Sequence, residues 1–165
     1  MIEIVQGDML TVEADVAVLS AHPTLIAGSG LSGHFHREAG PELEAAAKGL
    51  GPLQPGHSVV TKGYRLNAPL VVHAVAPRYL VGSEQEQATL RQTYMSVFEH
   101  DELADCQNIV FPAIGVGIYR WPVLLAASIA LAALKESPFK QTTVCLYDDE
   151  NFYAYKQLIQ RSLLY

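Results

Sequence analysis

Short apolar runs rich in valine, isoleucine and threonine recur along the chain and alternate with longer segments of helical periodicity. Each short run is bounded by turn-forming residues, a pattern typical of β-strands. Strands are therefore predicted over residues 2–6, 15–21, 58–62, 70–75, 108–113 and 142–147. Two of the runs, Val16-Ala17-Val18-Leu19 and Leu70-Val71-Val72, are continuously apolar. A strand with this pattern is buried on both faces, as in a sheet between two helix layers.

Helical segments separate these runs, and we predict helices over residues 32–48, 84–103, 122–136 and 149–163. The first ends at Lys48-Gly49, while Ser83 and Glu86 form a capping-box pattern at the start of the second. Pro122 suits a first helical position, and the last helix has acids at its start and Arg161 near its end. The last two strand–helix steps favour parallel neighbours, and the early strand pairs can supply antiparallel edges. The fold class expected is α/β, a three-layer α/β/α domain with a central mixed six-stranded sheet.

Composition narrows the possible partners. The 165 residues predict a single domain over 1–165, with 50% hydrophobic and 17% charged residues, which excludes disorder. A net charge of −6 with 11 lysines and arginines disfavours binding to nucleic acid or to an anionic membrane. The apolar run 123–134 is too short to span a bilayer, and no secretory signal is visible. Cys106 and Cys145 fit small core residues of a reduced, cytoplasmic protein.

Two glycine-rich loops stand at predicted strand-to-helix junctions. Glycine lets successive N–H groups point into one concavity, and a helix N-terminus beyond adds partial positive charge. One such loop alone is as readily a tight turn, whereas two on one small sheet favour a clamped diphosphate. Neither loop has the Gly-Lys-Ser/Thr ending of a nucleoside triphosphatase loop. The loop residues are Gly28, Ser29, Gly30, Leu31, Ser32 and Gly33 in the first, and Gly115, Val116, Gly117, Ile118 and Tyr119 in the second.

Asp8 follows the first predicted strand directly. The default role of an aspartate directly after a strand is to cap a turn. Its functional interpretation is a hydrogen-bond acceptor for the exocyclic amine of a base.

Several segments together resemble the macrodomain family, in the right order over almost the whole chain. They are similar above all to the bacterial branch with O-acetyl-ADP-ribose deacetylases and ADP-ribosyl hydrolases. The segments are Val5-Gln6-Gly7-Asp8, Asp15-Val16-Ala17-Val18, Gly33-His34-Phe35-His36-Arg37-Glu38-Ala39-Gly40-Pro41-Glu42-Leu43, Thr61-Lys62-Gly63-Tyr64, Val72-His73-Ala74-Val75-Ala76-Pro77, Phe111-Pro112-Ala113-Ile114-Gly115-Val116-Gly117-Ile118-Tyr119 and Leu146-Tyr147-Asp148.

The resemblance implies a cleft for ADP-ribose at the carboxyl ends of the strands, without a cofactor. Asp8 would take the adenine amino group beside the Met9 backbone, and Tyr147 would lie against the adenine face. The two glycine loops would enclose the diphosphate and distal ribose, with Tyr119 near the reactive end. The alternative for Tyr147 is an ordinary core tyrosine with its hydroxyl at the surface.

The chain departs from the family at the positions that carry hydrolysis. The active branch has an Asn-Ala-Ala-Asn run after the second strand, where this chain reads Leu19-Ser20-Ala21-His22. The branch also has an aspartate, proposed to activate water, where this chain has Ser32. A serine is no base near neutral pH without a neighbour that takes its proton. His22 is a candidate substitute base, and the alternative is that it only hydrogen-bonds a ribose hydroxyl or the local backbone.

A metal site is not predicted. Although His22, His34 and His36 are close in sequence, residues i and i+2 of a helix point to different sides, and no cysteine is nearby. We expect a surface His34, a packed His36 and a hydrogen-bonded core His73.

The sequence thus predicts a protein that binds ADP-ribose or a derivative, including O-acetyl-ADP-ribose or a mono-ADP-ribosylated protein, with weak or absent hydrolase activity. The first alternative is an active ADP-ribosyl-protein hydrolase or O-acetyl-ADP-ribose deacetylase. In it His22 or a substrate-positioned water replaces the missing base. The second alternative is a partner-binding domain without nucleotide affinity.

Overall fold

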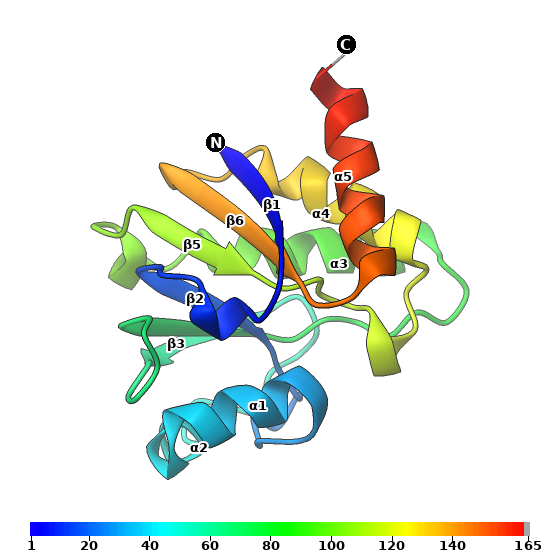
Figure 1. The fold of residues 1–165 in the computed structure, drawn as a ribbon. Helices are drawn as coiled ribbons and strands as arrows, with labels where there is room; N and C mark the ends of the chain where they lie inside the picture. The colour runs from blue at the N-terminus through cyan, green and yellow to red at the C-terminus, as the bar shows by residue number, and fades with distance from the viewer. Residues whose placement is uncertain (164–165) are drawn as a thin grey trace.

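In the computed structural model, which describes residues 1–163, six strands form one mixed sheet in the order β1-β6-β5-β2-β4-β3 (Figure 1). Neighbouring strands are parallel except β3 and β4, which are antiparallel. The predicted mixed sheet is confirmed, but the first two strands are not neighbours, so β3 alone supplies an antiparallel edge. The strands are β1 (Ile2–Gln6), β2 (Val16–Ser20), β3 (Ser58–Lys62), β4 (Leu70–Ala74), β5 (Asn108–Phe111) and β6 (Gln141–Leu146).

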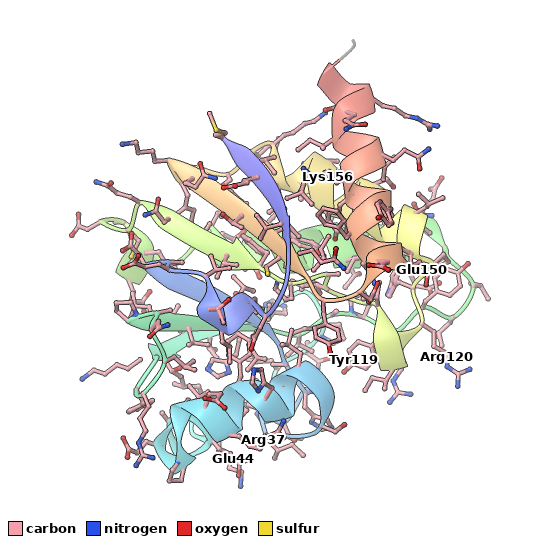
Figure 2. All side chains as sticks on the ribbon, in the orientation of Figure 1. Arg37, Glu44, Tyr119, Arg120, Glu150 and Lys156 are labelled. Carbon is pink, nitrogen blue, oxygen red and sulfur yellow. The ribbon has the colours of Figure 1, made fainter. Side chains whose placement is uncertain are left out.

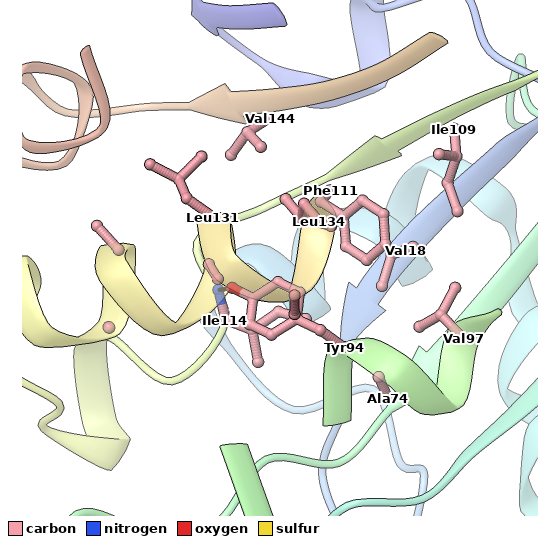
Figure 3. Packing of buried hydrophobic residues seen from close by; sticks show 14 of the residues in the cluster. Val18, Ala74, Tyr94, Val97, Ile109, Phe111, Ile114, Leu131, Leu134 and Val144 are labelled. Carbon is pink, nitrogen blue, oxygen red and sulfur yellow. Dashed lines mark hydrogen bonds between the residues drawn. The ribbon is translucent and has the colours of Figure 1, made fainter. Parts of the chain in front are cut away.

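Helices cover both faces of this sheet. Alternate residues of β2 enter different layers: Ala17 and Leu19 belong to the same buried cluster as Phe35, whereas Val16 and Val18 pack with Tyr94. Figure 3 shows this second cluster, in which side chains of α3 and α4 fill the space against the sheet. One layer is α1 (Gly30–Ala39) and α2 (Pro41–Lys48), and the other is α3 (Glu84–Val97), α4 (Val123–Leu134) and α5 (Asp149–Leu163). The predicted three-layer α/β/α architecture is therefore confirmed.

The helix predicted over 32–48 is wrong, because the chain forms two helices there. Gly40 has φ +91° and ends α1, and Pro41 begins α2. Proline disfavours a helical conformation in the residue before it and has no N–H to continue the ladder. A glycine in the left-handed region completes the break.

Other boundaries are closer to prediction. α3 ends at Val97 rather than near 103, because the chain becomes extended at His100 before a short 3-10 turn at Asp101–Leu103. The capping box of Ser83 and Glu86 is confirmed, and Pro122 is the N-cap of α4 instead of its first helical residue. The acids at the start of α5 and Arg161 in its last turn are also confirmed.

Among the helices described within residues 1–163, none combines the length and apolar character needed to cross a membrane.

The parallel strands decide where a site can form. Because β1, β2, β4, β5 and β6 run in one direction, their carboxyl ends meet at a single edge of the sheet. Asp8, the loop before α1, the segment after β4, the 3-10 turn η3 (Gly117–Tyr119) and Tyr147 all follow these ends. In open α/β sheets this edge is the usual place for ligands.

Candidate functional site

The two glycine loops present a series of unpaired backbone N–H groups. Within the part of the chain that the structure describes, no N–H of residues 28–32 donates to a protein acceptor, and the first helical bond is that from Gly33 to Ser29. The N–H groups of residues 115–119 are equally without acceptors among the described residues. Unpaired amides at a helix start and in a turn form an anion-binding concavity. The site thus offers donors for an anion without a lysine.

The backbone of both loops requires glycine. Gly28 and Gly30 have φ of +65° and +60°, and Gly115 and Gly117 have +93° and +85°, conformations that other residues adopt only with strain. At Gly33 the reason is space, since a Cβ there would lie 2.9 Å from the Gly28 carbonyl oxygen.

The side chains of Ser32 and Glu44 hydrogen-bond to the backbone of Ala27, just before the first glycine loop. The Ser32 hydroxyl donates to the Ala27 carbonyl at 2.6 Å, and the Ala27 N–H donates to the Glu44 carboxylate at 2.6 Å. The Ser29 side chain makes no capping bond, so the amides at the start of α1 stay open. The loop is held in place while its donors remain free.

Asp8 sits at the start of the turn Met9–Thr11 and is joined to α1. Its Oδ1 accepts from the Leu10 N–H at 3.0 Å, and its Oδ2 lies 3.0 Å from His34 Nε2. Burial acts to raise the pKa of Asp8, but the Leu10 N–H and His34 outweigh it, so the pKa lies below its ordinary value. Asp8 is therefore an anionic acceptor at neutral pH. His34, expected at the surface, is instead half-buried against this carboxylate.

Tyr147 directly follows β6, next to the segment after β1 that carries Asp8, and it is 86% exposed. The alternative of an ordinary core tyrosine is therefore wrong. Gln6 Nε2 donates to the Tyr147 carbonyl at 3.4 Å and to Asp149 Oδ1 at 2.8 Å, which fixes the backbone of this corner. Met9 is buried, and Cys145 on β6 donates its thiol hydrogen to the Gly7 carbonyl. An exposed aromatic ring on a fixed backbone is suited to stacking.

His22 lies two residues after the end of β2 and is exposed. Its Nδ1 accepts from the Thr24 N–H at 3.1 Å and lies 2.8 Å from the Thr24 hydroxyl. Since Nδ1 is an acceptor, the neutral ring carries its proton on Nε2. The free nitrogen of His22 is then a hydrogen-bond donor.

Two residues at this edge were missed by sequence reasoning. Arg78 and Tyr79 follow β4 and, with Leu80, line a cavity of about 330 Å³ against Ile118, Tyr119 and Arg120. The Tyr79 N–H donates to the Tyr119 carbonyl at 3.0 Å, and the Arg78 guanidinium lies 5.7 Å from the Tyr119 ring centre. Figure 2 shows Tyr119 on η3 and Arg120 directly after it, with Arg120 pointing outward. The signal available in the sequence was an arginine directly after Pro77, at the end of a buried strand.

Two of the four remaining histidines are buried. His36 is buried on α1 and His73 is fully buried on β4, their ring centres 6.4 Å apart. His73 Nε2 lies 2.8 Å from the Thr61 hydroxyl, but Nδ1 has no partner within the described residues. The expectation of a fully hydrogen-bonded His73 is thus only half met.

Comparison with known proteins identifies what this arrangement is similar to. The family model described as Macro domain matches residues 18–130, more than half of the chain. A protein of Cronobacter turicensis named O-acetyl-ADP-ribose deacetylase is 38% identical, with 96% of this chain and 95% of that protein covered. One of the same name from Enterobacter sp. is 39% identical, with 98% and 96% covered.

Solved structures agree with the sequence matches. The macrodomain of Oceanobacillus iheyensis with ADP superposes with a TM-score of 0.92 and 27% identity, covering 98% of this chain and 91% of that one. The Trypanosoma brucei macrodomain in complex with ADP-ribose gives a TM-score of 0.84 and 28% identity, covering 96% and 68%.

Proposed function

The chain belongs to the macrodomain family, and from that premise we propose that it binds ADP-ribose or a close derivative at the carboxyl edge of its sheet. One observation carries the proposal: Asp8, exposed Tyr147 and two loops of open amides meet at this edge. Structural neighbours that hold ADP and ADP-ribose support it.

Each part of the ligand has a matching partner. The adenine amino group donates to Asp8, beside the Met9 backbone, while the ring stacks on Tyr147. The diphosphate lies between the amides of residues 28–33 and those of residues 115–119. Tyr119 packs near the distal ribose, and the Nε2–H of His22 donates to a ribose hydroxyl. Backbone donors hold the two phosphate charges in a protein of net charge −6.

Calorimetric titration of ADP-ribose tests the proposal, and Asp8→Ala tests the base contact. The wild-type chain is expected to give saturable heat below about 1 mM ligand. Asp8→Ala is expected to weaken binding about tenfold, because a charge-assisted hydrogen bond to the base is lost. The same variant is expected to bind ribose 5-phosphate, which lacks the base, as the wild type does.

Asp105→Ala is the control, because Asp105 is an exposed carboxylate before β5, at the amino edge of the sheet. Absence of heat with the wild-type chain would contradict nucleotide binding and favour the partner-binding alternative. Full affinity of Asp8→Ala would remove Asp8 from base recognition and leave the loop assignment standing.

We further propose that this chain hydrolyses its ligand weakly or not at all. The Ser32 hydroxyl donates to the Ala27 carbonyl, and the Nδ1 lone pair of His22 is occupied by Thr24. Neither group is oriented to take a proton from water. The proposed roles of both are in shaping and binding.

The second candidate function is O-acetyl-ADP-ribose deacetylation or removal of ADP-ribose from protein, favoured by the names of relatives 38% and 39% identical. Release of acetate from O-acetyl-ADP-ribose, and of ADP-ribose from a mono-ADP-ribosylated protein, decides between the two. We expect turnover close to the buffer rate. If turnover is rapid and His22→Ala abolishes it without a change in affinity, His22 is a base. Rapid turnover that survives His22→Ala assigns the chemistry to a substrate-positioned water.

A further inference from the structure

Four of the six residues that line the cavity of about 330 Å³ beside η3 have no contact with ADP-ribose in the function proposed above. We refer to this cavity as the arginine cavity. It is lined by Arg78, Tyr79, Leu80, Ile118, Tyr119 and Arg120. Ile118 and Tyr119 also belong to the loop assigned to the diphosphate and distal ribose. The arginine cavity therefore begins where the distal end of the ligand would stop.

Among residues 1–163, its two arginines have no carboxylate partner. Arg78 and Arg120 are exposed, and neither forms an ion pair or hydrogen bond through its side chain within the described residues. Glu86, which lies eight residues after Arg78, is already engaged by the N–H groups of Leu80, Val81 and Ser83 and by the Ser83 hydroxyl. In a chain with 11 lysines and arginines and a net charge of −6, two free cations at one cavity favour an anionic partner.

Large apolar side chains next to these arginines are exposed to solvent. Leu80, Val81 and Ile118 are 76%, 80% and 81% exposed. Among the large apolar residues described, only Met1 and Tyr147 have comparable exposure. Large apolar groups gathered in this way mark an interaction site.

The segment that carries them is rigidly fixed. Glu86 binds the backbone at residues 80–83, and the Trp121 indole N–H donates to the Pro77 carbonyl at 2.9 Å. The Tyr79 ring packs edge-on against Trp121 with ring centres 5.2 Å apart. The backbone that carries Leu80 and Val81 is thus already ordered, which lowers the entropic cost of binding a partner.

We infer that the arginine cavity and the adjoining Leu80 and Val81 bind the polypeptide that carries ADP-ribose, selecting an acidic segment with apolar residues beside the modified side chain. The inference rests on the proposed function, because ADP-ribose held between the glycine loops directs its acceptor to this cavity. Arg78 and Arg120 pair with carboxylates of that segment, and Leu80 and Val81 cover its apolar side chains. The two arginines are specificity residues.

The test compares peptides that carry ADP-ribose through a stable triazole link, with glutamates or with glutamines on both sides of the modified position. The wild-type chain is expected to bind the glutamate peptide about fivefold more tightly, the size expected for two exposed ion pairs. The preference is expected to fall below about twofold at about 0.5 M salt. In the double variant Arg78→Gln with Arg120→Gln, it is expected to disappear.

Arg161→Gln is the control, since Arg161 is an exposed arginine on α5. It is expected to keep the full preference. Free ADP-ribose separates the two hypotheses: if it does not bind, the proposed function fails. If it binds but both peptides bind equally at low salt, the arginine cavity has no role in acceptor choice. Equal loss of both peptides in the double variant would also overturn the inference, because it would place the arginines in general phosphate binding.

Discussion

Gly117→Glu is expected to abolish ADP-ribose binding, with a loss of affinity of at least about 100-fold. The substitution acts in two ways. Gly117 has φ +85°, where a side chain costs about 1 kcal/mol or more in backbone strain. The new carboxylate would also lie among the open amides of residues 115–119, where it competes with the diphosphate for the same donors. Repulsion between the carboxylate and the two phosphates adds to the loss. Calorimetric titration with ADP-ribose measures it.

Two further variants separate these causes. Gly117→Ala introduces the strain without the charge, and we expect a loss of about tenfold or less. Gly49→Glu introduces the charge at the end of α2, where φ is −68° and the nearest atom to a new Cβ is the Ala46 oxygen at 3.7 Å. It is expected to bind as the wild type does.

Apart from Gly117 and its two neighbours in the chain, no described atom lies within 4 Å of a Cβ built at this position, so the variant is expected to keep its fold, which circular dichroism checks. Wild-type affinity in a folded Gly117→Glu would mean that this loop does not hold the diphosphate.

The fold was predictable because its elements have strong local signals. Buried strands such as 16–19 read as uninterrupted apolar runs, and α3 starts at the capping box of Ser83 and Glu86. The break at Gly40-Pro41 was missed because the apolar periodicity continues through it, with Phe35 and Leu43 entering the same core cluster. The helix breaks there because Gly40 has a positive φ, which the apolar periodicity does not report.

In the candidate site, too, the features with a local signal could be predicted from the sequence, and the long-range contacts could not. The glycine loops are visible in the sequence because residue type alone reports backbone conformation. The pairing of His34 with Asp8 is not visible, because it joins residues 26 positions apart and depends on how α1 rotates against the turn Met9–Thr11. The arginine cavity likewise requires the segment after β4 to meet η3, which only the sheet order brings about.

The buried pair His36 and His73 leads to a prediction about stability. His73 is fully buried on β4, and its Nδ1, like that of His36, has no partner among the described residues. Burial, reinforced by the neighbouring His36, lowers the pKa of His73 from 6.5 to about 4. Burial also lowers the pKa of His36, although Glu44 opposes this effect. On mild acidification, His73 and His36 therefore take up protons more readily in the unfolded chain than in the folded chain.

The free energy of unfolding is accordingly expected to fall on mild acidification. Since the folded-state pKa of His73 lies below its unfolded value, its contribution is complete above pH 6.5 and is lost as the pH falls toward 4. Linkage through His73 alone removes about 2 kcal/mol between about pH 7 and pH 5, and His36 adds to this loss. Urea unfolding at several pH values in this window measures the slope.

His73→Gln identifies the source of that slope. The glutamine amide keeps a donor for the Thr61 hydroxyl, which lies 2.8 Å from His73 Nε2, but cannot accept a proton in this pH range. We expect the variant to be less stable at neutral pH and clearly flatter between about pH 7 and pH 5. His57→Gln, at an exposed histidine, should keep the wild-type slope. A His73→Gln slope equal to that of the wild type would assign the acid sensitivity elsewhere, because carboxylates such as Asp8 and Glu86, whose pKa values are lowered, lose their stabilising effect only at lower pH.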